Sequence, residues 1–164
     1  ISGTMPHLCV FGRKKPFGHG QMHRRNSMPE SFSKKATLIK EYLSQLEEYL
    51  LECTGGKQPS DKTVFSIERL FQLVVDEAVD VNALILETEK RPIPDTNSGT
   101  FEALAEAHVI PRSLHARIAG SVGLRNRLVH RYETVQRNVL LREVPKYAEA
   151  YKEYLARVIQ KYLS

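Results

Sequence analysis

The chain has 164 residues, of which 41% are hydrophobic and 26% charged, a composition that suits one domain with a buried core. Its formal charge of +5 arises in residues 1–29, which hold five basic residues and no acidic one, so the remainder has 24 − 5 = 19 basic and 19 acidic side chains. This balance excludes a uniformly basic nucleic-acid-binding surface beyond residue 29. Any attraction for anions there must come from local clusters of charge.

The cysteines and the apolar runs of the sequence predict neither disulfide bonds nor a membrane-spanning helix. Cys9 and Cys53 lie in dissimilar surroundings and form no disulfide framework, which fits a reducing compartment. No uninterrupted apolar run approaches the roughly 20 residues that a helix needs to cross a bilayer. We therefore expect a cytoplasmic protein with no membrane partner.

Residues 1–30 are rich in glycine, proline and basic side chains, and this predicts an extended arm in front of a helical domain spanning residues 31–164. Two interpretations of the arm stay open. It is either a tag, leader or solvated tail, partly added for expression, or a tail that binds RNA or a partner through its basic residues.

Two long helices are predicted first along the chain. One begins at Ser31 or Ser33 with a serine cap and ends at about Cys53, before two glycines. The next begins at Ser60 or Asp61 and continues to about Lys90, where two prolines prevent further helix. Apolar residues in this second helix alternate steps of three and four, the spacing of a core helix in an antiparallel bundle.

Three more helices complete the prediction. A short one is capped by Ser98 or Thr100 and ends near His108, and a longer one starts at Pro111. The last is expected from about Leu141 or Pro145 to Leu163, with tyrosines at helical spacing that are better suited to packing than to stacking on RNA. No segment shows sustained two-residue alternation, so the predicted fold is all-α: an antiparallel bundle of four long helices and one short one.

An acidic group interrupts the apolar pattern in the middle of the second helix, at Asp76, Glu77 and Asp80. In one interpretation these side chains form a solvated face or pair with nearby arginines. In the other, Asp80 or Glu77 orients Arg125 or His130 across the bundle.

Side chains that could take part in catalysis are most concentrated in residues 124–132, Leu-Arg-Asn-Arg-Leu-Val-His-Arg-Tyr. His130 can transfer a proton near neutral pH, and Arg125 and Arg127 stay charged and suit phosphate. Arg125 and His130 are five residues apart, so on an ideal helix they diverge by about 140°. They can act together only if the helix ends or bends, if the long arginine reaches round, or if a second chain completes the site. Gly120 and Gly123 precede the segment and would permit either a bend or the close approach of another helix.

The order Arg125, four residues, His130, one residue, Tyr132 resembles the R-x-x-x-x-H-x-Y signature of HEPN-domain ribonucleases. With Asn126 after the arginine, the segment is similar to that of HepT-type toxins from HEPN/MNT toxin–antitoxin pairs. The resemblance covers about residues 32–164 and includes the acidic helix with Glu77 and Asp80.

This resemblance implies an endoribonuclease whose RNA substrate is a tRNA or an mRNA. The 2′-hydroxyl of the RNA would attack the phosphodiester, with no metal or other cofactor. Arg125 and His130 would be catalytic, and Asn126 would help to position the phosphate or the histidine. Arg127 and Arg131 would bind RNA. The family also implies a homodimer or higher oligomer.

The resemblance further implies that Tyr132 is AMPylated by a cognate MNT-type, MntA-like nucleotidyltransferase antitoxin, which neutralises the toxin. Spacing alone fits equally well a buried tyrosine that continues the apolar stripe of Leu124 and Leu128. Two rival functions also stay open: a noncatalytic HEPN subunit that binds nucleotide or a nucleotidyltransferase, and a purely structural dimer.

Overall fold

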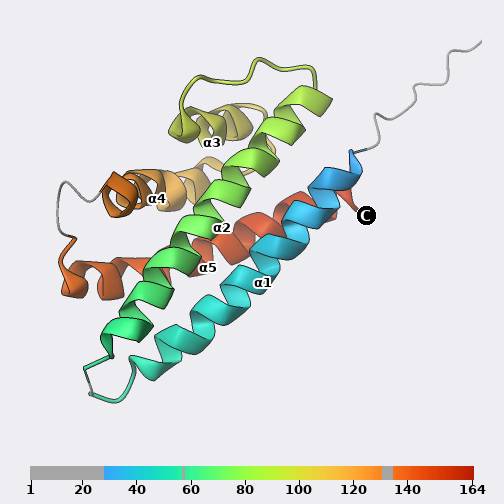
Figure 1. Ribbon diagram of the computed structural model, residues 1–164. Coiled ribbons are helices and arrows are strands. Elements are labelled where there is room, and N and C mark those ends of the chain that lie inside the picture. Colours follow the sequence, from blue (N-terminus) through green and yellow to red (C-terminus); the bar gives the residue numbers. More distant parts are fainter. Residues whose placement is uncertain (1–27, 57, 131–134) are drawn as a thin grey trace, which may run out of the picture.

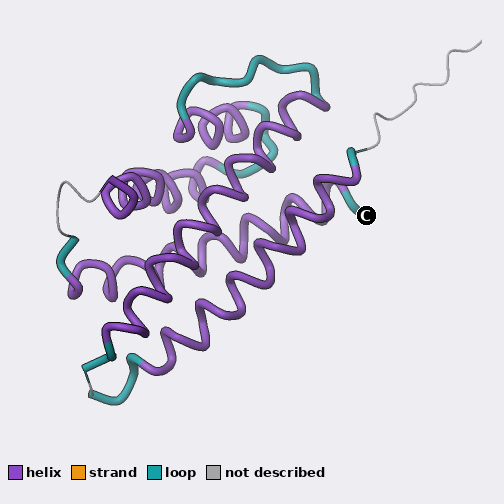
Figure 2. Tube along the Cα trace, in the orientation of Figure 1, coloured by secondary structure: helices purple, strands orange, loops and turns teal. Residues whose placement is uncertain are grey.

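The computed structural model describes residues 28–56, 58–130 and 135–164 (Figure 1). Its helices are α1 (Glu30–Glu52), α2 (Asp61–Thr88), α3 (Asn97–Glu106), α4 (Arg112–His130) and α5 (Arg137–Tyr162). In the described ranges the chain is helix joined by loops, with no strand (Figure 2). The predicted architecture of four long helices and one short one is confirmed. The arm predicted for residues 1–30 lies almost wholly outside the described residues.

Helices α1 and α2 lie side by side as an antiparallel pair (Figure 1). The turn between them contains Gly55 and Gly56, whose φ angles of 105° and 79° suit glycine because it has no Cβ. The start predicted for α2, Ser60 or Asp61, is confirmed, and Ser60 caps the helix: its hydroxyl accepts a hydrogen bond from the backbone N–H of Thr63 at 3.1 Å. The serine cap predicted for α1 is not formed, since Pro29 occupies the position before the helix.

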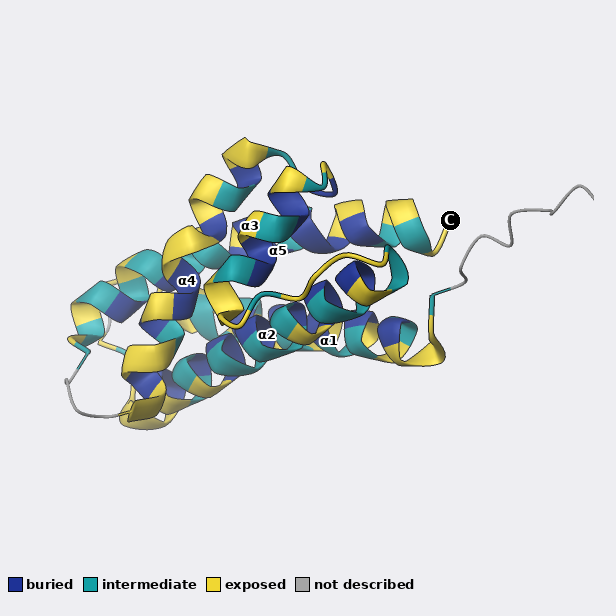
Figure 3. Cartoon of the chain, turned by 90° about the horizontal axis from the view of Figure 1, so that it is seen from above, coloured by how far each residue is buried: buried dark blue, intermediate teal, exposed yellow. Residues whose placement is uncertain are grey.

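Helix α5 packs against α1, α2 and α4 and supplies the largest buried side chains of the core. Tyr151 and Tyr154 are both 0% exposed, so the packing interpretation of these tyrosines is confirmed. The Tyr154 hydroxyl donates to Asn82 Oδ1 at 2.7 Å, and the Tyr151 hydroxyl shares a 2.7 Å hydrogen bond with Ser121 on α4. Partners of this kind offset the cost of burying a phenol. On each helix the buried residues lie on the side that faces the other helices, and the exposed residues lie on the opposite side (Figure 3).

The start of α5 differs from the prediction. Proline is common in a first helical turn, which placed the start at Leu141 or Pro145, but the helix begins at Arg137 and contains Pro145. Proline inside a helix removes one backbone hydrogen bond. Leu140 and Val144, which are 1% and 0% exposed, bury apolar surface in the turns before it and offset that loss.

None of the helices in the described part of the chain is both long and apolar enough to span a membrane.

Candidate active site on helix α4

The segment expected to carry catalysis forms the C-terminal third of α4. Leu124 and Leu128 face the core, at 1% and 9% exposure, and fix the rotation of the helix. Asn126, Arg127 and His130 are consequently exposed on the outer side. The predicted catalytic and RNA-contacting residues that the structure describes are therefore accessible, apart from Arg125, which is half-buried.

Arg125 lies against α2, where it is held by Asp76. Its NH2 group donates to Asp76 Oδ2 at 2.9 Å, and its Nε lies 2.7 Å from Asp76 Oδ1 in an ion pair without the alignment of a hydrogen bond. Its NH1 group donates to Asn126 Oδ1 at 3.3 Å. A guanidinium carries five N–H donors. Two of them, one on each terminal nitrogen, are left for another acceptor such as a phosphate oxygen.

In the acidic group of α2, Asp76 pairs with an arginine, as one of the two interpretations expected, whereas Glu77 and Asp80 pair with a lysine. Lys35 on α1 donates to Glu77 Oε2 at 2.8 Å and to Asp80 Oδ2 at 2.7 Å. Burial opposes the charge on Lys35, but its hydrogen bonds to Asp80 and Glu77 and their negative charges outweigh this effect, so the pKa of Lys35 is raised. The carboxylate that orients Arg125 is Asp76, and the expectation that Asp80 or Glu77 would do so is wrong.

Helix α4 continues without interruption to His130. The bend or early helix end that would bring Arg125 and His130 together is therefore not formed before His130. On a regular helix the two side chains diverge by about 140°. Of the routes considered from the sequence, an arginine reaching round the helix conflicts with its attachment to Asp76. Completion of the site by a second chain is the route compatible with this geometry.

Gly120 allows close approach of another helix, one of the two roles considered for it. A Cβ atom at this position would collide with the hydroxyl of Tyr147 on α5. Burial and the charge of Glu143 raise the pKa of that hydroxyl, while the charge of Arg127 opposes the shift, so Tyr147 stays neutral at physiological pH. Gly123, in contrast, has open space where a side chain would be. Gly120 thus sets the packing of α4 against α5, and the helix continues through both glycines.

Arg131 and Tyr132, proposed from the sequence for RNA binding and for AMPylation, lie outside the described residues. From the sequence, Asp76 was one of three carboxylates that could pair with a nearby arginine, but it was not assigned to Arg125.

A family model described as Ribonuclease HepT-like matches residues 39–158, which is most of the chain and includes the whole described site. The chain belongs to the HepT-like ribonuclease family. Two relatives share much of its length. The tRNA nuclease HepT of Aphanizomenon flos-aquae is 31% identical over 138 residues, covering 84% of this chain and 93% of the relative. The mRNA nuclease HepT of Shewanella oneidensis is 22% identical over 124 residues, covering 74% and 90%.

Solved structures share the fold of this HepT-like chain. The tri-AMPylated HEPN toxin of Shewanella oneidensis, in complex with its MNT antitoxin, superposes with a TM-score of 0.73 at 20% identity and covers 81% of this chain and 99% of its own. The cytosolic protein YutE of Bacillus subtilis, of unknown function, gives 0.61 at 17% identity, with coverage of 76% and 87%. At these identities the likeness shows the fold alone.

Proposed function

We propose that this HepT-like protein is an endoribonuclease toxin that cleaves RNA without a metal. The observation that supports it most is Arg125, fixed by Asp76 with two N–H donors left, on the same helix as the exposed His130. Nuclease relatives that match most of the chain favour a tRNA or an mRNA as substrate.

The chemistry follows from what RNA supplies. The 2′-hydroxyl is the nucleophile, so the protein must remove its proton, stabilise the extra negative charge on phosphorus and protonate the leaving 5′-oxygen. His130 acts as general base or acid. Arg125 binds the scissile phosphate and stabilises its transition state, with Asn126 beside it. Arg127 and Arg131 bind neighbouring phosphates. The products end in a 2′,3′-cyclic phosphate and a 5′-hydroxyl, and DNA is not cut because it lacks the nucleophile.

A homodimer completes the site in this proposal. One chain offers one motif histidine, and its Arg125 points away from it. A second copy related by two-fold symmetry brings its own Arg125 and His130 to the same site and provides a second proton carrier. Val129, a large apolar residue that is 41% exposed beside His130, gives this end of α4 apolar surface for such a contact.

Neutralisation is proposed to occur by AMPylation of Tyr132 by an MNT-type nucleotidyltransferase antitoxin. The support is a structural neighbour that is a tri-AMPylated HEPN toxin bound to MNT antitoxin. Tyr132 follows His130 by two residues. An attached AMP therefore brings negative charge and bulk next to the imidazole, where the substrate phosphate must bind.

Cleavage of RNA in the presence of EDTA tests the ribonuclease proposal. The wild-type protein is expected to cut RNA equally well with and without the chelator. His130→Ala and Arg125→Ala are expected to fold, by circular dichroism, and to lose cleavage by at least about 100-fold. Equal cutting by all three proteins would identify a contaminating nuclease, and loss of wild-type cutting in EDTA would refute the metal-free mechanism.

Mass spectrometry tests the modification. After incubation with ATP and the cognate nucleotidyltransferase, the protein should gain mass in units of AMP and lose ribonuclease activity. Tyr132→Phe should gain none. Modification of another residue, or activity that persists in the modified protein, would contradict the proposed role of Tyr132.

A further inference from the structure

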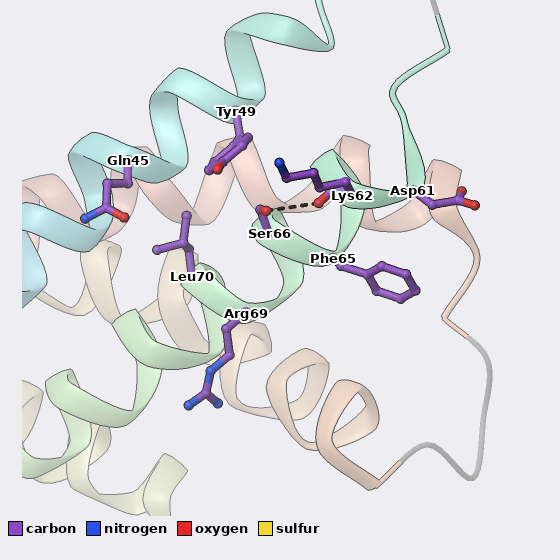
Figure 4. Close-up of a pocket in the computed structure, with 8 residues that line it drawn as sticks. All are labelled: Gln45, Tyr49, Asp61, Lys62, Phe65, Ser66, Arg69 and Leu70. Atoms are coloured by element: carbon purple, nitrogen blue, oxygen red, sulfur yellow. Dashed lines mark hydrogen bonds between the residues drawn. The ribbon is translucent and has the colours of Figure 1, made fainter.

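A groove of about 560 Å³ lies between α1 and the N-terminal half of α2, apart from the motif of α4 (Figure 4). Its α1 side is formed by Gln45 and Tyr49, and its α2 side includes Lys62, Phe65 and Arg69. Basic and aromatic side chains thus line one open depression. This combination is typical of surfaces that bind single-stranded nucleic acid.

The two cations of the groove differ from most others in the described part of the chain. Most lysines and arginines that the structure describes are within ion-pair distance of a carboxylate. Asp61, the acidic residue that lines the groove, pairs with Arg137 on α5 and not with either groove cation. Within the described ranges, Lys62 and Arg69 make no ion pair. Both are exposed. Their charge is therefore available to an external anion instead of being neutralised within the fold.

Phe65 is 63% exposed, which is unusual for an aromatic residue on a helix whose other large apolar residues are mostly buried. In Figure 4 its ring extends outward from α2, while Tyr49 projects toward the groove from α1. Phe65 is three residues after Lys62 and four before Arg69 on the same helix. Its exposed ring can stack on a base whose neighbouring phosphates those two cations contact.

The spacing of residues along α2 relates the groove to the Arg125 site. Lys62, Arg69 and Asp76 are spaced seven residues apart and so share one face of the helix. At 1.5 Å per residue, Arg69 lies about 10 Å along the helix from Asp76, which holds Arg125, and Lys62 about 21 Å. In Figure 4 Arg69 points away from α1, toward the side of α2 on which α4 lies.

We propose that this groove binds single-stranded RNA next to the scissile phosphodiester. One base stacks on Phe65, and Lys62 and Arg69 each hold a backbone phosphate of the strand as it runs along α2 from the catalytic Arg125. The inference rests on the proposed ribonuclease function, because it assigns a place for the part of the substrate beyond the cleaved bond.

Binding of a fluorescein-labelled single-stranded RNA of about ten nucleotides tests the groove. The probe is titrated with full-length protein carrying His130→Ala, so that it is not cut, and fluorescence anisotropy is measured at several salt concentrations. Adding Phe65→Ala is expected to raise Kd by roughly 5- to 100-fold. Adding Lys62→Ala or Arg69→Ala should each lower the slope of log Kd against log salt by about 0.7.

Matched controls come from the same helix pair. Leu51 on α1 is 68% exposed, as apolar and open as Phe65, and Lys40 on α1 is an exposed cation with no ion pair among the described residues. Leu51→Ala and Lys40→Ala should leave Kd unchanged. If these controls weaken binding as much as the groove variants do, or if the groove variants bind like the parent, the groove assignment is refuted.

Cleavage separates this inference from the proposed function. In the His130-containing protein, Phe65→Ala and Arg69→Ala should reduce kcat/KM more for a long single strand than for a dinucleotide, which is too short to reach the groove. Equal losses on both substrates would contradict the groove. A wild type that cuts neither substrate would refute the ribonuclease, while the anisotropy result would still decide the groove. Unchanged RNA binding with lost binding of the nucleotidyltransferase would reassign the groove to protein docking and overturn the proposal.

Discussion

Arg125 owes its orientation to a residue with no place in the recognised motif. Asp76 contacts two of its three nitrogens, which restricts the guanidinium to one plane and aims the remaining N–H donors away from α2. An arginine that is already ordered loses less conformational entropy when it binds a phosphate. Asp76 is thus a positioning residue for the proposed reaction.

Asp76→Asn should therefore lower kcat by roughly 10- to 100-fold, since small misplacements of a catalytic group are costly. The free energy of unfolding should change by less than about 1 kcal/mol, because both members of the ion pair are partly exposed to solvent. Steady-state kinetics and urea denaturation of the same preparations measure both effects.

Glu77→Gln is the matched control, because Glu77 neighbours Asp76 in sequence but pairs with Lys35. It should retain wild-type kcat. A loss of activity in the control equal to that of Asp76→Asn would indicate a general effect of charge on α2 and contradict the positioning role.

The sequence located the candidate site but did not identify this partner. The spacing of Arg125, Asn126 and His130 picked out the segment, because chemical groups of these kinds rarely gather on one short stretch. The choice among three carboxylates depends on the rotation of α2 about its axis, and neighbouring residues there differ by 100°. Asp76 reaches Arg125 on α4, and Glu77 reaches Lys35 on α1. The packing of these two helices against α2 therefore decides which carboxylate meets Arg125.

At the scale of whole elements, the position of α4 depends on contact with α5 at Gly120. Gly120→Ala would gain up to about 1 kcal/mol of helix propensity. It would also drive a methyl group into the Tyr147 hydroxyl, and overpacking of this kind costs roughly 1–3 kcal/mol. We expect a net loss of about 1 kcal/mol in the free energy of unfolding, measured by urea denaturation.

Two further variants test whether the contact between position 120 and Tyr147 causes this loss of stability. Tyr147→Phe removes the hydroxyl and should restore part of the loss in the Gly120→Ala background. Gly123→Ala, three residues along α4 with open space around it, should stabilise the protein. Additive effects of Gly120→Ala and Tyr147→Phe would show that the two positions do not interact.

Helix boundaries were predictable where a local signal acts alone. The start of α2 was predicted correctly at Ser60 or Asp61, because the Ser60 hydroxyl needs only the backbone N–H three residues later to cap the helix. The start of α5 was misplaced because the burial of Leu140 and Val144, a property of the whole bundle, outweighs the local effect of Pro145.

At the scale of the whole molecule, the divergence of Arg125 and His130 on a continuous α4 predicts a site shared between two chains. Mixing unfolded Arg125→Ala and His130→Ala proteins and refolding them together should then restore activity. Random pairing makes half of the dimers mixed, and each mixed dimer keeps one Arg125 and the other chain's His130 in the shared site. Activity should therefore rise above that of either variant alone, to at most about half of the wild-type activity. Cleavage assays on the refolded mixture measure it. No recovery would contradict a site made of one Arg125 and the partner's His130.

The buried tyrosines of α5 predict how stability depends on pH. Burial raises the pKa of the Tyr151 and Tyr154 hydroxyls, so both stay protonated in the folded state where the unfolded chain, with phenol pKa values of about 10, loses its protons. The unfolded state then binds fewer protons, and the free energy of unfolding falls as pH rises above about 10.

Each such phenol contributes a slope of up to about 1.4 kcal/mol per pH unit in that range. Urea denaturation at several pH values from neutral to alkaline measures the slope. Tyr151→Phe should make the decline shallower, and an unchanged slope would contradict the assignment.

The contact at Gly120 has a consequence for the evolution of this family. Because the Tyr147 hydroxyl occupies the volume that a side chain at position 120 would need, position 120 cannot gain a side chain while Tyr147 keeps its place. Homologous sequences with alanine or serine at the first position should carry a residue smaller than tyrosine at the second. Such paired replacements would be recorded as covariation between α4 and α5, a trace of helix packing and not of catalysis.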